Sequence, residues 1–363
     1  MPLPSQPQAS GLLVRVAFTL GNLTASNDRN RELIGIEFNG VPMLVRHLEQ
    51  VGSRYLRSAG DDASVAGSAE LEEVLVKLIR LLANISINPD VGTQVVATSG
   101  VQTLVALLSH SMSADREELL LNVVSAITNL SFYVLQQHCG TTADESKGLD
   151  DPEPLSFIFA GHQEICTDLV GVLVHENEEA VAEAARAFGN FSRDPQVRQF
   201  MGSSRSDEAL VLLLDHASRE VVFSAVGALV NIAADPTTKR VLVKPDLLGH
   251  AKLVSVLRRA GLSDAELSAV ACKALHNLLL DTRVGGAESA LGPATFGLLH
   301  RTLDELLDAA ADAAADAADE AEAKGAEDPC DAFLRDFLSA ARALQSILDE
   351  ARGQEWEDLE EPR

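Results

Sequence analysis

Apolar residues recur at intervals of three and four in several stretches of about fifteen residues. In the segment 117–130 they fall at Leu120, Val123, Val124, Ile127 and Leu130. This spacing places them on one face of a helix and predicts an amphipathic helix that buries that face. The same pattern predicts long helices at 11–23, 72–85, 179–191, 220–232 and 265–278.

Polar breaks follow the long helices, and three of them contain Pro89, Pro195 or Pro236. Each break is followed by a short apolar segment, such as 196–201 or 238–243, and then by a longer one, such as 101–108, 209–214 or 252–257. The chain therefore repeats a unit of one short, one medium and one long helix.

A five-residue phrase closes the long helices and appears six times, as LGNLT, LANIS, ITNLS, FGNFS, LVNIA and LHNLL. Its asparagines are 62, 45, 61, 41 and 46 residues apart. Three gaps match the period of about 40–47 residues that is typical of two- and three-helix repeats. The two longer gaps equal one period plus an insertion. A repeat of this length predicts a stacked solenoid, a class that mostly binds other molecules.

Two insertions rich in Gly, Ser, Asp and Pro, at 51–70 and 137–156, are predicted to be surface loops, with docking loops as the alternative. We expect a disordered stretch at 1–10 and a repeat array at 11–290. A degenerate capping repeat is expected at 291–352, interrupted by the acidic Ala-rich segment 308–328, and an acidic tail at 353–363. Segment 308–328 is expected to be a solvated helical extension or disordered, or else an acidic docking arm.

The helix at 11–23 is a third helix with no room before it for its own first two. Its apolar face is therefore expected to be partly uncovered. Either the chain is a fragment of a longer protein, or a partner covers that end.

The net charge of −25 argues against nucleic acid as a partner, because phosphate binding needs a basic surface. Residues 304–363 carry −14 of this charge. The four cysteines, scattered without a CxxC pair, indicate a reducing compartment. No apolar run is long enough for a membrane span, so no membrane partner is expected. A binding scaffold of this kind is also not expected to have a small-molecule substrate.

Catalytic motifs are not evident: the sequence has no GxGxxG, GxxxxGK[ST] or HExxH pattern. A metal site from His162 and Cys166, with His138 and Cys139 nearby, would need more converging ligands than the pattern supplies. We therefore expect no enzyme activity and no cofactor, and keep a catalytic or cofactor-binding protein only as a distant alternative.

The three-helix unit that ends in Leu-x-Asn-Leu-Ser resembles the armadillo repeat over about residues 11–280. The resemblance implies an all-α, right-handed superhelical solenoid. It also implies a concave groove in which asparagine side chains bind the backbone of an extended peptide or a helical segment. The residues that carry this expectation are Asn22, Asn84, Asn129, Asn190, Asn231 and Asn277.

The residues four before the asparagines modify this expectation. Importin-type armadillo proteins have Trp there, and its absence from all six positions disfavours nuclear-import cargo. Arg80, Arg186 and Lys273 occupy three of the six and lie on the same helix face as their asparagines, forming a basic strip that would select an acidic ligand. The alternatives are that each asparagine bonds to backbone within its own repeat and that the basic side chains are ordinary solvated charges.

Segments 13–24, 76–85 and 117–133 resemble those of ciliary armadillo proteins. That resemblance implies a non-enzymatic adapter in axoneme assembly, located in the cytoplasm and cilium, that links radial-spoke cargo to intraflagellar transport. The first alternative is a stationary structural component of the axoneme. A second is a generic cytoplasmic armadillo scaffold that binds peptides.

Overall fold

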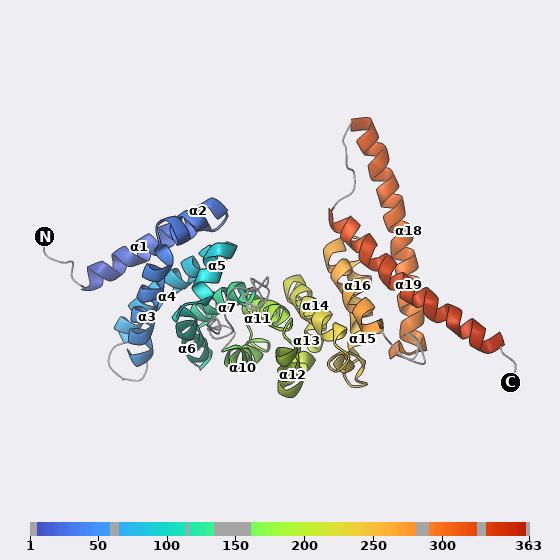
Figure 1. Cartoon of the computed structure of the whole chain (residues 1–363), viewed down its shortest axis with the longest axis horizontal. Coiled ribbons are helices and arrows are strands. Elements are labelled where there is room, and N and C mark those ends of the chain that lie inside the picture. Colours follow the sequence, from blue (N-terminus) through green and yellow to red (C-terminus); the bar gives the residue numbers. More distant parts are fainter. Residues whose placement is uncertain are drawn as a thin grey trace, which may run out of the picture. The chain divides into compact units, whose positions relative to one another are not determined.

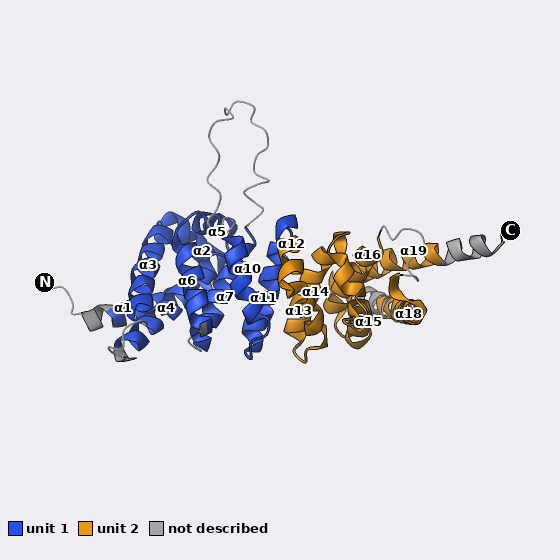
Figure 2. Ribbon diagram, turned by 90° about the horizontal axis from the view of Figure 1, so that it is seen from below, with its two compact units in different colours: residues 1–197 blue, residues 198–363 orange. Residues whose placement is uncertain are grey.

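The computed structural model describes residues 6–58, 65–113, 116–133, 161–280, 290–324 and 332–360. Its residues divide into two compact units, 1–197 and 198–363, with the boundary inside helix α12 (Pro195–Ser204) (Figure 2). Within the described ranges every regular element is a helix, which confirms the all-α expectation.

Unit 1 begins with α1 (Gln6–Thr24), which packs against α4 as a third helix does (Figure 1). The next repeat contains α2 (Asp28–Glu32), the π-helix η1 (Leu33–Glu37), α3 (Gly40–Ser58) and α4 (Val65–Ile85). It is followed by α5 (Pro89–Val96), α6 (Gly100–Ser113) and α7 (Glu117–Ser131), and then by α10 (His162–Val172) and α11 (Glu178–Phe191).

Unit 2 continues with α13 (Ser206–Leu212), the 3-10 turn η2 (Leu213–Asp215) and α14 (Arg219–Ala234). The 3-10 helix η3 (Lys239–Val243), α15 (Gly249–Ala260) and α16 (Ala265–Leu279) form the next repeat. The long helices α18 (Pro293–Lys324) and α19 (Ala332–Glu360) complete the unit.

The third helices form a continuous stack within each unit. In unit 1, α1 packs against α4, α4 against α7 and α7 against α11; in unit 2, α14 packs against α16 and α16 against α19. Second helices pack on their own third helix and on the next second helix, as α3 does on α4 and α6. Each repeat therefore buries its apolar face mainly against its neighbour, as solenoid repeats do.

Small apolar side chains fill the core, and the few large buried rings include Tyr55, Phe188, Phe191 and Phe337. Polar side chains close the helix ends: Asn88 and Asn177 accept backbone N–H bonds at the starts of α5 and α11. In the described residues no single helix is both long and apolar enough to cross a bilayer, although the bent pair α5–α6 has the required composition.

The predicted loop 51–70 is wrong over most of its length. Helix α3 continues to Ser58 and α4 begins at Val65, so only 59–64 lie outside the described residues. The helix continues because Leu44, Leu48, Val51 and Tyr55 extend its buried stripe at intervals of three and four. The predicted loop 137–156 lies outside the described residues.

The predicted boundaries at the two ends also need correction. Helix α1 already begins at Gln6, inside the stretch 1–10 that was expected to be disordered, and Pro7 suits a first turn that needs no N–H. Helix α19 extends to Glu360, into the stretch 353–363 that was predicted to be an acidic tail. In the acidic segment, by contrast, the expected helical extension is confirmed up to Lys324, where α18 ends, as alanine favours. Residues 325–328 and 361–363 lie outside the described residues.

Candidate peptide-binding groove

Within each unit, the third helices bring the predicted asparagines into register, one per repeat. We call these six residues the asparagine ladder: Asn22 on α1, Asn84 on α4, Asn129 on α7 and Asn190 on α11 in unit 1, and Asn231 on α14 and Asn277 on α16 in unit 2. Asn22 is exposed, and the other five are half-buried. Their amides are therefore reachable from solvent at the end of each third helix.

Most ladder amides bind the preceding repeat. The Nδ2 atom of Asn84 donates to the carbonyl of Gly21 at 2.9 Å, and Asn129 donates to Ala83 at 2.9 Å. Asn190 donates to the Thr128 carbonyl at 3.3 Å and to Ser131 Oγ at 3.0 Å. In unit 2, Asn277 donates to Val230 at 3.0 Å.

The acceptor in all four cases is the carbonyl of the residue just before the previous ladder asparagine. The alternative in which each asparagine bonds within its own repeat is therefore wrong for these four residues. The bonds join neighbouring third helices across 46 to 63 residues of sequence. The ladder thus has a structural role between repeats, beside any role in binding.

Hydroxyl groups two residues after the asparagines close the third helices of unit 1. Thr24 donates to Leu20, Ser86 to Leu82, Ser131 to Thr128 and Ser192 to Gly189. These hydroxyls add a side-chain donor to carbonyls in the last turn of each helix, where backbone donors run out. The sequence carried this signal in the fifth position of the phrase, which is Ser or Thr in the first four copies and Ala233 or Leu279 in the last two.

The basic strip, Arg80, Arg186 and Lys273, is exposed at its three predicted positions. Arg186 pairs with Glu183 at 3.2 Å on the same helix, and Lys273 pairs with Asp336 of α19 at 2.8 Å. Burial raises the pKa of Glu183, and the Arg186 guanidinium opposes that rise. Among the described residues, no carboxylate pairs with Arg80, so the uncompensated charge of the strip lies on α4 of unit 1.

Chemically reactive side chains are not gathered in the described part of the chain, where no group of three His, Cys, Asp or Glu residues could hold a metal ion. Cys166 and Cys272 are buried, and burial raises the pKa of each thiol to about 12. Both stay protonated at neutral pH, whereas the thiolate is the nucleophile and metal ligand. His162 lies on α10 with Cys166, while His138 and Cys139 lie outside the described residues.

Comparison with known proteins identifies similar sequences over most of the chain. It is 33% identical over 305 residues to Armadillo repeat-containing protein 2 of Bos taurus, covering 81% of this chain and 33% of that protein. The mouse protein of the same name (Mus musculus) is 32% identical over 268 residues, covering 73% and 29%. The chain therefore spans about a third of the length of these relatives. No protein-family model matches the chain.

Solved structures agree with the fold. A designed armadillo repeat protein, YIII(Dq)4CqI, superposes with a TM-score of 0.55 at 22% identity and covers 76% of this chain and 95% of its own. Another design, solved in complex with the peptide (KR)4, gives a TM-score of 0.52 at 21% identity, covering 76% of this chain and 100% of its own. These similarities show that the fold is that of an armadillo solenoid.

Proposed function

Because the chain is an armadillo repeat protein, similar over most of its length to Armadillo repeat-containing protein 2, we propose that it is a non-enzymatic scaffold that binds segments of other proteins along its third helices. The observation that carries this proposal is the asparagine ladder, which repeats one solvent-reachable amide per third helix. Solenoids use such extended surfaces for binding.

The hydrogen bonds of the ladder leave capacity for a ligand. A side-chain amide has two N–H donors and one oxygen with two lone pairs. The bond from Asn84 to Gly21 or from Asn129 to Ala83 uses one donor. One donor and the oxygen remain for a peptide backbone, which presents N–H and C=O groups whatever its side chains are.

The charges beside the ladder favour an acidic segment. The strip residues are Arg or Lys, and Arg80 has no carboxylate partner within the described residues. A peptide carboxylate near Arg80 would gain a charge-assisted hydrogen bond. The designed protein solved with (KR)4 holds a basic peptide instead, so its ligand preference is not carried over to this chain.

The place of action proposed for this scaffold is the motile cilium. The support is the similarity to Armadillo repeat-containing protein 2 and the resemblance of segments 13–24, 76–85 and 117–133 to ciliary armadillo proteins. In this proposal the protein is an adapter in axoneme assembly that connects radial-spoke cargo to intraflagellar transport, in the cytoplasm and the cilium.

Filming a fluorescently tagged chain in a ciliated cell while its cilia regrow tests this role. The adapter should move processively along growing cilia, and the moving signal should fade once they reach full length. A steady, immobile signal along the finished axoneme would instead identify a structural component. Exclusion from cilia at every stage would contradict both, and would leave a scaffold that acts elsewhere.

A further inference from the structure

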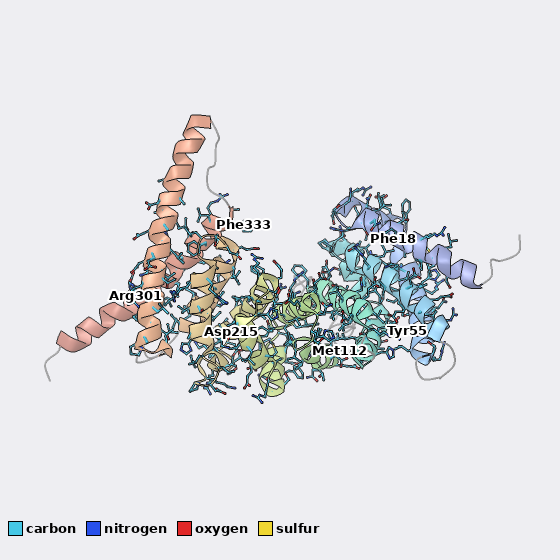
Figure 3. The ribbon with its side chains drawn as sticks, turned by 180° about the vertical axis from the view of Figure 1, so that it is seen from behind. Phe18, Tyr55, Met112, Asp215, Arg301 and Phe333 are labelled. Carbon is cyan, nitrogen blue, oxygen red and sulfur yellow. The ribbon has the colours of Figure 1, made fainter. Side chains whose placement is uncertain are left out.

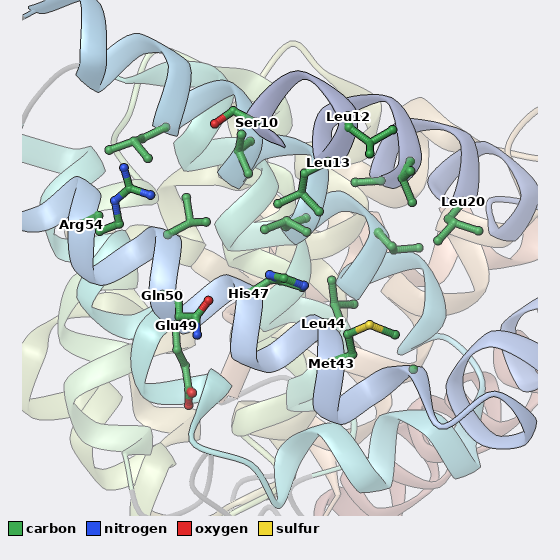
Figure 4. A pocket seen from close by; sticks show the side chains of 18 of the residues that line it. Ser10, Leu12, Leu13, Leu20, Met43, Leu44, His47, Glu49, Gln50 and Arg54 are labelled. Atoms are coloured by element: carbon green, nitrogen blue, oxygen red, sulfur yellow. The ribbon is translucent and has the colours of Figure 1, made fainter. Parts of the chain in front are cut away.

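An apolar trough of about 1050 Å³ lies at the first repeat of unit 1, between α1, α3 and α4 (Figure 4). Leu13, Val16 and Leu20 of α1 form one wall, and side chains of α4, such as Val74 and Leu78, also line it. Large apolar side chains around it reach solvent: Leu12 is 62% exposed, Met43 58% and Phe38 72%. Phe18, also on α1, is half exposed (Figure 3). Six of the fourteen large apolar side chains that are exposed in the described residues lie between Leu12 and Met43.

The repeat geometry defines what shape would fill the trough. Each later second helix of unit 1 lies against its own third helix and the next second helix: α3 contacts α4 and α6, and α6 contacts α7 and α10. The trough lies between the third helix α1 and the next second helix α3. The trough therefore corresponds to the position that a second helix takes in the later repeats. An α-helix placed there would pack against α1 and α3 as those second helices pack against their neighbours.

The side of α3 that faces the trough differs from the sides that second helices present to one another. Met43, His47, Gln50, Arg54 and Arg57 line the trough at intervals of four and three, along one stripe of the helix. By contrast, Gly52 and Tyr55 lie on the side of α3 that contacts α6, where the Glu49 carboxylate also accepts a hydrogen bond from Ser99 Oγ just before α6. A side chain at Gly52 would meet Thr103 at 2.7 Å, and Tyr55 packs edge-on against His110.

Two positive charges therefore stand at the trough without a partner in the described residues. Arg54 and Arg57 are exposed and take part in none of the ion pairs of unit 1. The trough lining also contains one carboxylate, that of Glu49, which is hydrogen-bonded to Ser99. Arg54 and Arg57 therefore leave an excess of positive charge on the lining, which would attract an acidic ligand.

We propose that the trough binds an amphipathic α-helix of a partner protein, with its apolar face on α1 and α4 and acidic side chains paired with Arg54 and Arg57. Helix-in-groove binding uses apolar anchors at i, i+3, i+4 and i+7, and this spacing suits the Leu- and Val-lined walls. The surface is separate from the asparagine ladder, so the two proposals can fail independently.

A second copy of the chain is the less suitable occupant. Its acidic helices are α18 and α19, but the leucines Leu299 and Leu303 of α18 and Leu344 and Leu348 of α19 are already fully buried within unit 2. A partner helix that has a free apolar face and acidic side chains beside it can both cover the apolar walls of the trough and pair with its arginines.

A phage-displayed library of random 14-residue peptides, the length of α6, tests the proposal. It is selected against the whole chain and counter-selected against a Val16→Asp/Met43→Asp variant. Val16 is 44% exposed and Met43 58%, so this variant should fold, which circular dichroism verifies. The enriched sequences should combine apolar residues at helical spacing with Glu or Asp on one flank. A failure to enrich, or enrichment of sequences without acidic residues, would overturn the proposal.

Charge exchange then tests the pairing. Arg54→Glu/Arg57→Glu should weaken binding of a selected peptide by about tenfold or more, and replacing the peptide acids with Lys should restore it. Arg258→Glu, at an exposed position of α15, is the matched control and should change nothing. Unchanged binding by the double variant would refute the pairing. Sedimentation that shows a dimer dispersed by Val16→Asp/Met43→Asp would identify a second copy as the occupant and refute the partner helix.

A groove variant separates this surface from the ladder. Asn22→Ala/Arg80→Glu alters the groove and should leave the affinity for a selected peptide unchanged. Loss of binding in this variant would place the peptide in the groove and overturn the trough assignment. If the groove variant still binds the selected peptide with unchanged affinity, the trough proposal holds even if the groove proposal fails.

Discussion

Helix α3 has one side covered by α6 and another facing the trough, and the two sides carry different chemistry. On the covered side, Gly52 lets Thr103 approach closely, and Tyr55 is 1% exposed against His110. On the trough side, Met43 is 58% exposed, and Arg54 and Arg57 are exposed and form no ion pair with a described residue. Both sides belong to the same helix, so the contrast follows from what each side contacts.

The contrast shows how a repeat distinguishes a neighbour from a ligand. A face that always contacts the next repeat can carry glycine and a buried ring, because that repeat is part of the same chain and always covers the face. A face that must also tolerate water keeps charged ends on long side chains. The ladder combines both roles, because its amides bind the preceding repeat and remain half-exposed.

The largest expected effect lies on the covered side of α3. Tyr55→Ala should lower the free energy of unfolding by about 3–5 kcal/mol, because it leaves a cavity where a fully buried ring packed. Met43→Ala, on the trough side, should cost less than about 0.5 kcal/mol, since its side chain is already largely in water. Urea unfolding followed by circular dichroism measures both. Equal losses would contradict the distinction between the two sides.

The ladder should show an intermediate effect. Asn129→Ala removes the donor to the Ala83 carbonyl and should lower the free energy of unfolding by about 1–2 kcal/mol. Asn22→Ala should have almost no effect, because the Asn22 side chain is exposed and makes no hydrogen bond with another described residue. The melting temperatures of the two variants, each compared with that of the wild-type protein, measure these effects. If both variants melt together, the amides do not hold the repeats to one another.

The smallest effect is a dependence on alkaline pH. Burial, and next the hydrogen bond to Glu72, raise the pKa of Tyr55 from 10.0 to about 12. Between these values the unfolded chain has lost a proton that the folded chain retains, so this contribution to stability is complete below pH 10 and is lost as pH rises toward 12. Tyr55→Phe should make the fall in unfolding free energy over this range less steep. An identical slope in the two proteins would show that Tyr55 titrates normally.

The third helices could be predicted closely from the sequence. The repeated five-residue phrase marks the ends of these helices, and the apolar spacing marks their buried faces. The helix predicted at 117–130 is observed as α7 (Glu117–Ser131), and the one predicted at 265–278 is observed as α16 (Ala265–Leu279). The loop at 51–70 was over-predicted because Gly52, Ser53 and Gly60 read as loop residues. Gly52 is instead helical and needed for the close contact with α6.

The candidate surfaces were only partly predictable. The asparagines could be placed on one face from their repetition, but their acceptors lie on another helix at least 46 residues away, beyond the reach of local pattern. The uncovered face of 11–23 was expected from the missing helices before it. The basic wall that α3 contributes to the trough was not foreseen, because it depends on which side of α3 is turned toward α1.

The most direct test of the account is whether the groove is needed in the cell. In ciliated cells that lack the protein, wild-type chain and the Asn22→Ala/Arg80→Glu variant are expressed at equal levels, with Arg258→Glu as control. Cryo-electron tomography then counts radial spokes per length of axoneme. The account predicts that wild type and control restore the spokes and that the groove variant, with an unchanged melting temperature, does not. Full restoration by the groove variant would contradict the proposal that the third-helix groove binds the partners through which this protein acts.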